Sequence, residues 1–393
     1  MDSVRERQIM IITGLRRTGK TTLMYQAIER LLETEDPRKV LYFSFEEPSP
    51  GPKEVEHYEK GVLREPFEDA GRIYVFFDEV QYASGWASTI KRFYDLYPNL
   101  KFFVSGSSSL LLSKEALERL AGRFFFLELK PLTFFEFLEM KGAEVGRLEG
   151  SKRRAEILFS EYLMKSGFPE LAGWGDEAKI AEYIRSVVVD RAILRDIPVI
   201  FGSRDIELSE RLMGLILPNP GMIANVNALS ESLGRSRITV SNYLRYIEAS
   251  MLVRSLSNFR PAILSSSRKL RKVYPAAPSL IFAYDREAFK ESAGAVLETY
   301  AVGALGARHY FREGRKEVDM ILKGGTGGKE ILPVEVKTSV GERDLRKFSG
   351  LVEYVGARRG IMISFNQAFS SGNVEVYPAY YAERIFQHEA TRE

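Results

Sequence analysis

The residues best suited to chemistry begin with a glycine loop that contains a lysine and two threonines. The loop follows a buried-type strand, Ile9 to Thr13, and precedes a helix-like stretch, Leu23 to Leu32. In this context backbone N–H groups face phosphates, the lysine reaches the β and γ phosphates, and a hydroxyl can ligate Mg²⁺. We expect ATP or ADP to contact Gly14, Leu15, Arg16, Arg17, Thr18, Gly19, Lys20, Thr21 and Thr22, with Thr21 on the metal.

Two adjacent acids could complete this site. The apolar run Ile73-Tyr-Val-Phe-Phe ends in Asp78 and Glu79. In P-loop enzymes the acid at such a strand end holds Mg²⁺, and an adjacent glutamate can polarise the attacking water. We assign those roles to Asp78 and Glu79, with Lys20 and Glu79 as catalytic residues. An acidic turn after a buried strand is the alternative.

Two further positions have open alternatives. Ser107 lies just past an expected strand end, where its hydroxyl could contact the γ phosphate or the water, but a serine-rich turn would look the same. Arg123 could supply positive charge to the transition state, in cis or from a neighbouring chain. A structural arginine fits its position equally well.

The surrounding elements predict a parallel sheet. Runs typical of strands span 40–45, 101–105 and 124–129, and they alternate with helical stretches such as 86–97. Such alternation requires right-handed crossovers and a doubly wound sheet. The carboxyl ends of its strands would bring the loop and the two acids together.

A basic segment follows in the middle of the chain. Residues 221–272 hold nine basic and two acidic side chains, a local charge of +7 within a chain of net +3. Val226 to Leu233 and Ser236 to about Met251 read as two helices separated by Gly234, and 252–259 could form a hairpin wing.

This spacing predicts a winged helix-turn-helix. We expect Ile238, Tyr243 or Leu244, and Ile247 to face its core. Side chains left outside are of types that contact phosphates and base edges, and the local charge favours nucleic acid, DNA in particular, over the alternative of a protein-binding winged helix. The expected nucleic-acid contacts are Arg235, Arg237, Thr239, Asn242 and Arg245.

A second candidate metal site lies near the carboxyl terminus. Alternation along Ile331 to Lys337 puts Glu335 and Lys337 on one face, and a hairpin can bring Asp319 beside them. This Asp and Glu-x-Lys constellation resembles restriction-type nucleases. Asp319 and Glu335 would hold Mg²⁺ against a phosphate, Lys337 would act as the catalytic lysine, and Glu298 is an additional ligand candidate. A salt-bridged cross-strand cluster would show the same pattern.

Together these motifs resemble a family of archaeal and bacterial AAA-type P-loop ATPases with a C-terminal restriction-endonuclease-like domain of unknown function. The similar passages are Gly-Leu-Arg-Arg-Thr-Gly-Lys-Thr-Thr-Leu (14–23), Asp-Glu-Val-Gln (78–81) with Gly85-Trp86, Ser-Gly-Ser-Ser-Ser-Leu (105–110), Ala-Gly-Arg (121–123) with Leu-Lys-Pro-Leu-Thr-Phe (129–134), and Gly-Phe-Pro-Glu (167–170). One departure is Tyr274-Pro-Ala-Ala-Pro, where relatives tend to place an acid and a glycine after the tyrosine.

The resemblance and the patterns imply an α/β multidomain chain. We expect a P-loop ATPase core at 1–133, a winged helix-turn-helix at 201–265 and a restriction-endonuclease-like α/β domain at 266–393. Helical patterns at 134–140, 155–166 and 178–193 resemble the helical lid of AAA-type proteins, which we place at 134–200, although a helical linker would show the same apolar faces.

Composition excludes several kinds of chemistry. The chain has no cysteine and three scattered histidines, His57, His309 and His388, so thiolate and paired-histidine metal sites are excluded. The apolar run near the amino terminus is too short for a signal peptide, and no stretch is long enough to span a membrane. We expect a cytoplasmic ATPase that acts with a nuclease-like domain on nucleic acid and has a possible protein partner or forms a homo-oligomer. The alternative is a nucleotide-switched signalling or scaffold protein.

Overall fold

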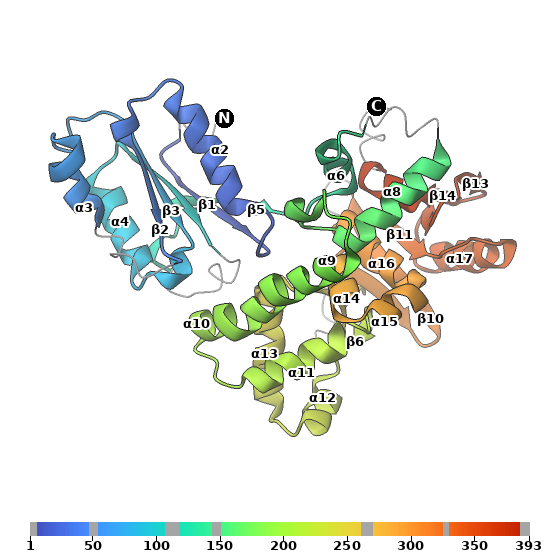
Figure 1. The fold of residues 1–393 in the computed structure, drawn as a ribbon. Coiled ribbons are helices and arrows are strands. Elements are labelled where there is room, and N and C mark those ends of the chain that lie inside the picture. The colour runs from blue at the N-terminus through green and yellow to red at the C-terminus, as the bar shows by residue number, and fades with distance from the viewer. Residues whose placement is uncertain are drawn as a thin grey trace. The chain divides into compact units, whose positions relative to one another are not determined.

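The computed structural model describes residues 6–46, 54–106, 118–143, 151–260, 270–324 and 330–385, and its elements are drawn in Figure 1. Contacts divide the chain into two units. Unit 1 comprises Met1–Lys130, Arg191–Ile206 and Ala249–Met251. Unit 2 comprises Pro131–Asp190, Glu207–Glu248 and Leu252–Glu393.

The described part of unit 1 builds a sheet of five parallel strands in the order β2-β3-β4-β1-β5 (Figure 1). This confirms the expected parallel sheet. The strands are β1 (Ile9–Gly14), β2 (Val40–Ser44), β3 (Ile73–Asp78), β4 (Leu100–Ser105) and β5 (Phe124–Leu129).

Helices cover both faces of this sheet. Successive residues of β1 point to opposite faces, so Ile12 packs with Met24 of α2 on one face and Ile11 packs with Ile90 of α4 on the other. The sheet is therefore doubly wound, as expected. The helical elements are α2 (Lys20–Leu32), η1 (Pro37–Lys39), α3 (Glu54–Tyr58), η2 (Glu59–Leu63), η3 (Val80–Tyr82), α4 (Trp86–Leu96), η7 (Ala192–Asp196) and α10 (Ile197–Phe201).

Unit 2 contains a mixed sheet with nine strands among its described residues, in the order β13-β14-β12-β11-β10-β9-β7-β8-β6. The strands are β6 (Met222–Ile223), β7 (Val253–Asn258), β8 (Arg271–Pro275), β9 (His309–Glu313), β10 (Lys316–Gly324), β11 (Glu330–Val336), β12 (Gly360–Ser364), β13 (Phe369–Ser371) and β14 (Val374–Pro378). Within it β10 is antiparallel to β9 and β11, whereas β11 and β12 are parallel.

Two long helices lie on opposite faces of this sheet. Tyr300 of α16 packs with Val334 in one apolar cluster, and Phe348 of α17 packs with Met362 in another. The helical elements of unit 2 are α6 (Phe134–Met140), α8 (Lys152–Lys165), η5 (Pro169–Leu171), α9 (Glu177–Tyr183), η6 (Ile184–Asp190), α11 (Ile206–Ile216), α12 (Val226–Leu233), α13 (Arg237–Ala249), α14 (Pro278–Tyr284), α15 (Arg286–Glu291), α16 (Ala293–Ala304), α17 (Glu342–Tyr354) and η9 (Ala379–Arg384).

The two helices predicted around Gly234 are present. Gly234 ends α12 in the left-handed conformation, and the Ser236 hydroxyl accepts a hydrogen bond from the Thr239 amide at the start of α13. On α13 the buried apolar residues are Val240, Tyr243 and Ile247. The expectation that Ile238 faces the core is wrong, because its side chain is 76% exposed.

The observed division differs from the expected domain boundaries in two places. Strand β7 pairs with β9 through Ser257 and His309, so sheet hydrogen bonds cross the expected boundary at residue 265. The segment expected as a helical lid, 134–200, is split between the units at Asp190. No helix in the described ranges combines the length and apolar character needed to cross a membrane.

Candidate functional site

The glycine loop connects β1 to α2 as predicted. Gly14 and Gly19 have φ of 156° and 99°, a region that favours glycine. A Cβ on Gly14 would lie 2.4 Å from the Leu129 carbonyl oxygen of the neighbouring strand. Only glycine therefore lets the loop turn this close to the sheet.

Lys20 lies inside the loop. Its Nζ donates to the carbonyl oxygens of Gly14 and Leu15, each at 3.1 Å. The Thr18 hydroxyl donates to the same Leu15 carbonyl at 2.8 Å. Burial lowers the pKa of Lys20, whereas the charge of Glu79 acts in the opposite direction. The side chains of Arg17 and Thr22 are exposed, so only their backbone groups belong to the loop interior.

Asp78 meets Thr21 at the carboxyl edge of the sheet. Its Oδ2 accepts hydrogen bonds from the hydroxyls of Thr21 and Tyr42, each at 2.8 Å, and its Oδ1 accepts one from Ser105. Glu79 follows with φ of 54°, and its amide donates to the Ser105 hydroxyl at 3.2 Å. Thr21 and the Glu79 backbone are thus linked to Asp78, directly or through Ser105, whereas the metal and catalytic roles assigned to these residues stay predictions.

Two residues of this site were missed by sequence reasoning. Ser105 and Tyr42 contact Asp78, whereas the predicted Ser107 lies outside the described residues. Ser105 ends β4, which lies between β1 and β3 in the sheet. Knowledge of that strand order would have selected Ser105, because the last residue of the middle strand lies between the loop and Asp78.

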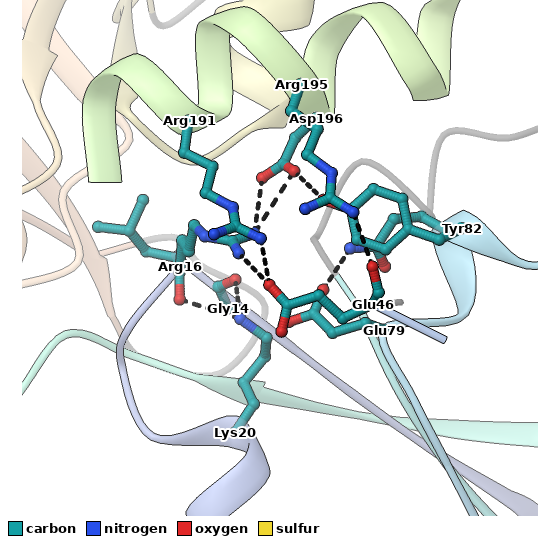
Figure 2. A network of polar contacts seen from close by, with 11 residues as sticks. Gly14, Arg16, Lys20, Glu46, Glu79, Tyr82, Arg191, Arg195 and Asp196 are labelled. Atoms are coloured by element: carbon teal, nitrogen blue, oxygen red, sulfur yellow. Dashed lines mark hydrogen bonds and ion pairs between the residues drawn. The ribbon is translucent and has the colours of Figure 1, made fainter. Parts of the chain in front are cut away.

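A network of ion pairs lies above Lys20 (Figure 2). Arg16 of the loop contacts Glu46 at 2.9 Å and Asp196 at 3.4 Å. Arg191 pairs with the same Glu46, and the Tyr82 hydroxyl donates to Asp196. The loop is therefore joined to the segment after β2 and to η7 by charged contacts.

The side chains of two members of this network, Arg16 and Asp196, are largely buried. The side chains of Arg16 and Asp196 are 10% and 5% exposed. Burial alone would lower the pKa of Arg16, but the charge of Asp196 and then that of Glu79 hold it above its ordinary value. The described residues leave a cavity of only about 10 Å³ beside Lys20, room for about one water. Its lining residues are Leu15, Arg16, Lys20, Glu79, Ala192, Asp196 and Ser250.

Arg123 lies at the other edge of the sheet. Its carbonyl oxygen accepts from the Ile9 amide at the start of β1, and its Nε pairs with Asp95 at 2.9 Å. A strand of six residues such as β5 spans about 20 Å. Arg123 therefore cannot reach phosphates bound by its own loop, which removes the cis role considered from the sequence.

Asp319, Glu335 and Lys337 are brought together by β10 and β11. The Asp319 Oδ2 accepts from the Val336 amide at 2.9 Å, and the Lys337 Nζ contacts the Glu335 Oε1 at 2.8 Å. Glu298 of α16 belongs to the same cluster, since the charge of Asp319 is the second cause, after burial, that raises the pKa of Glu298 to about 7. Burial and then Asp319 also raise the pKa of Glu335 to about 7.

Strand β8 adds two residues that sequence reasoning missed. The Lys272 Nζ lies 2.7 Å from Glu317, 3.7 Å from Glu298 and 4.0 Å from Asp319. The Tyr274 hydroxyl donates to Glu298 at 2.6 Å. Burial would lower the pKa of Lys272, but the charges of Glu298, Asp319 and Glu317 hold it above its usual value.

Two features of the sequence pointed to Lys272 and Tyr274, but neither identified them as part of the cluster. Lys272 and Tyr274 are two apart in a strand and so share one face. The sequence also departs from the family pattern just after Tyr274, within the segment that supplies these two residues. Among the residues that the structure describes, no group of three or more His, Asp or Glu side chains is arranged to hold a metal ion.

The expected nucleic-acid residues lie just before α13 and along its first nine residues. Arg237 and Arg245 are exposed, whereas Thr239 and Asn242 are half-buried. Arg235 lies 3.8 Å from Glu207 of α11. The side chains of Arg237 and Arg245 therefore lie outside the core, whereas Val240, Tyr243 and Ile247 pack into it.

Two family models match different parts of the chain. A family model described as an AAA domain matches residues 6–138. Residues 6–138 therefore carry an AAA-type P-loop domain. A second model, described as a domain of unknown function (DUF8612), matches residues 156–287. That match ends before Asp319, so the restriction-endonuclease-like fold stays a prediction.

Two relatives are similar over much of the chain. An uncharacterised protein of Haemophilus influenzae is 28% identical over 251 residues, which cover 62% of this chain and 61% of that protein. An uncharacterised protein of Methanocaldococcus jannaschii is 27% identical over 372 residues, which cover 88% of this chain and 79% of that protein.

Solved structures align weakly with the chain. Cdc6p from Pyrobaculum aerophilum aligns with a TM-score of 0.31 and 13% identity, covering 74% of this chain and 90% of that one. A chain of Drosophila ORC bound to AT-rich DNA and Cdc6 aligns with a TM-score of 0.27 and 12% identity, covering 74% and 88%. TM-scores this low do not establish a shared fold for the whole chain.

Proposed function

We propose that this protein hydrolyses ATP with Mg²⁺ at the carboxyl edge of the unit 1 sheet and couples nucleotide state to a nucleic-acid-binding unit 2. The observation that carries the proposal is the meeting of Lys20, Thr21, Asp78 and Glu79 at that edge.

The residues present suit Mg²⁺ and nucleotide. Magnesium prefers oxygen ligands, and the Thr21 hydroxyl and Asp78 carboxylate lie 2.8 Å apart. Loop amides and Lys20 would bind the phosphates, Thr21 and Asp78 would hold the metal, and Glu79 would orient the attacking water. The metal, when bound, would neutralise charge on the phosphates.

Coupling to unit 2 is supported by the path of the chain. The segment 191–206 belongs to unit 1 but is joined at both ends to unit 2. In this segment Asp196 pairs with Arg16, and Arg191 pairs with Glu46. Glu46 also pairs with Arg16. Phosphates bound beside Arg16 would compete with Asp196 and Glu46 for that guanidinium, and would so act on the connecting segment.

The ATPase proposal is tested by single substitutions in the purified full chain. We expect Lys20→Ala to abolish binding of a fluorescent ADP analogue, and Glu79→Gln to retain binding but lose phosphate release from ATP. Thr21→Ala should lose Mg²⁺-dependent binding, whereas Thr22→Ala, a matched change at an exposed neighbour, should behave as the parent. Normal hydrolysis by both Lys20→Ala and Glu79→Gln would refute the site.

A nucleic-acid role for unit 2 is supported by the order α11, β6, α12, α13, β7, β8, which is the order of a winged helix-turn-helix. The charge of +7 over 221–272, of which the buried Lys272 supplies one, fits a polyanion. We expect Arg237→Ala and Arg245→Ala each to weaken binding to duplex DNA and to reduce its salt dependence. Arg343→Ala, at an exposed position of α17, is the matched control.

A second candidate function is DNA cleavage by the carboxyl-terminal part of unit 2. It is favoured by the convergence of Asp319, Glu335 and Lys337 on adjacent strands that follow α16 and precede α17. The test is incubation with linear, circular and single-stranded DNA in Mg²⁺ or Mn²⁺, with and without ATP. Cleavage that Asp319→Ala leaves unchanged would refute it.

The same assays address the signalling or scaffold alternative. ADP that copurifies with the protein, slow turnover and no salt-sensitive affinity for DNA would favour that function over a nucleic-acid role.

A further inference from the structure

Lys272 is the most enclosed charged group of the carboxyl-terminal cluster. Its side chain is 8% exposed, and its Nζ also lies 5.5 Å from the centre of the Tyr310 ring. The surrounding carboxylates come from α16 and β10, whereas Lys272 comes from β8. The lysine thus enters the cluster from the hairpin that follows α13.

The ammonium lies at the meeting point of three carboxylates. Glu317, Glu298 and Asp319 have oxygens within 4.0 Å of the Lys272 Nζ. A divalent ion would need oxygens from the same groups at about 2.0–2.6 Å. The ammonium and such an ion therefore cannot use these carboxylates at the same time.

Other groups also contact oxygens of this cluster. The Glu298 Oε1 accepts from the Tyr274 hydroxyl, the Asp319 Oδ2 accepts from the Val336 amide, and the Glu335 Oε1 pairs with Lys337. Glu335 Oε2 is buried and has no hydrogen-bond partner among the described residues. Carboxylates that already hold an ammonium, a hydroxyl and an amide hydrogen form a poor site for a divalent cation.

From this geometry we infer that Lys272 is a built-in counter-cation that holds Glu298, Glu317 and Asp319 together and excludes a divalent metal ion from them. The cluster binds Mg²⁺ or Mn²⁺ when this ammonium is removed. The inference argues against metal-dependent cleavage by the parent protein, the second candidate function above, and it is independent of ATP hydrolysis.

Binding of Mn²⁺ to the full chain without nucleotide tests the inference. Free Mn²⁺ is measured by electron paramagnetic resonance. Each protein is compared with the same protein carrying Asp319→Asn, so that ions bound at the P-loop cancel. We expect the parent to bind no Asp319-dependent Mn²⁺ at neutral pH.

Lys272→Met removes the charge and keeps the length of the side chain. We expect it to bind one Asp319-dependent Mn²⁺ per chain, at least about tenfold more tightly than the weakest binding that the assay would detect in the parent, because one positive charge about 4 Å from the ligands is gone. Lys337→Met is the matched control at the other lysine of the cluster, whose side chain is 38% exposed and whose Nζ pairs with Glu335. It should leave the cluster without Mn²⁺.

The result that overturns the inference is an Asp319-dependent Mn²⁺ in the parent whose affinity Lys272→Met does not raise. If Lys272→Met does not fold, Lys272→Gln and the parent measurement decide the matter. Loss of ATP hydrolysis is read in a separate assay. A failed ATPase proposal beside the expected Mn²⁺ pattern would leave this inference intact.

Discussion

The ion pair between Arg16 and Asp196 should stabilise unit 1 by an amount that depends on the burial of its side chains rather than on its length. Asp196→Asn removes a carboxylate that is 5% exposed and leaves a guanidinium that is 10% exposed. Removing one partner of a buried pair costs about 3–5 kcal/mol. Glu46, which is 40% exposed, remains as a partner of Arg16, and the asparagine oxygen can still accept a hydrogen bond from Tyr82. We therefore expect the free energy of unfolding of unit 1 to fall by about 2–3 kcal/mol, less than for a pair left without any partner.

Hydrogen exchange measured by mass spectrometry on the full chain is the assay, because peptides from β1 and α2 report on unit 1 alone. The matched control is Asp95→Asn. The pair of Asp95 with Arg123 is shorter, at 2.9 Å against 3.4 Å, but its side chains are 43% and 32% exposed. An exposed pair contributes up to about 1 kcal/mol, so the control should change little.

If Asp95→Asn destabilised unit 1 as much as Asp196→Asn, the reasoning would be refuted. The stability contributed by an ion pair would then not depend on its burial. A loss below about 1 kcal/mol for Asp196→Asn would refute it as well. Arg16→Met provides a further check. In that background Asp196→Asn should cost much less than alone, since residues in contact are coupled.

Three further predictions concern two glycines that face close neighbours and one buried acid. Gly14→Ala should abolish binding of the ADP analogue, because its Cβ would lie 2.4 Å from a backbone oxygen. In unit 2, Gly360→Ala would bring a Cβ within 2.4 Å of Val352 and should cost about 1–3 kcal/mol in urea unfolding, whereas Gly350→Ala, exposed on α17, should stabilise by about 0.5–1 kcal/mol. Burial raises the pKa of Glu383 to about 7. A raised pKa in the fold favours the native state at low pH, so stability should fall as the pH rises from about 4.5 through 7, and Glu383→Gln should flatten that dependence in urea unfolding.

Sequence patterns predicted elements that depend on near neighbours in the chain. The strand, glycine loop and helix around Lys20 lie within a few residues of one another, so their geometry follows from local chemistry. The meeting of Thr21 and Asp78 was also predictable, because parallel strands share one carboxyl edge. Ile238 was misplaced because several faces of α13 carry apolar residues, and only the packed structure selects Val240 instead.

The sequence by itself determined the P-loop, the acid that meets Thr21 and the placing of Asp319 beside the strand that carries Glu335. Only the tertiary structure decided which charged side chains surround the P-loop and Asp319. Arg16 meets Asp196 from 180 residues away, and Lys272 meets Asp319 from another strand of the same sheet. Periodicity tells which face a side chain occupies, but the neighbour across that face depends on strand order and helix placement, which no local pattern encodes.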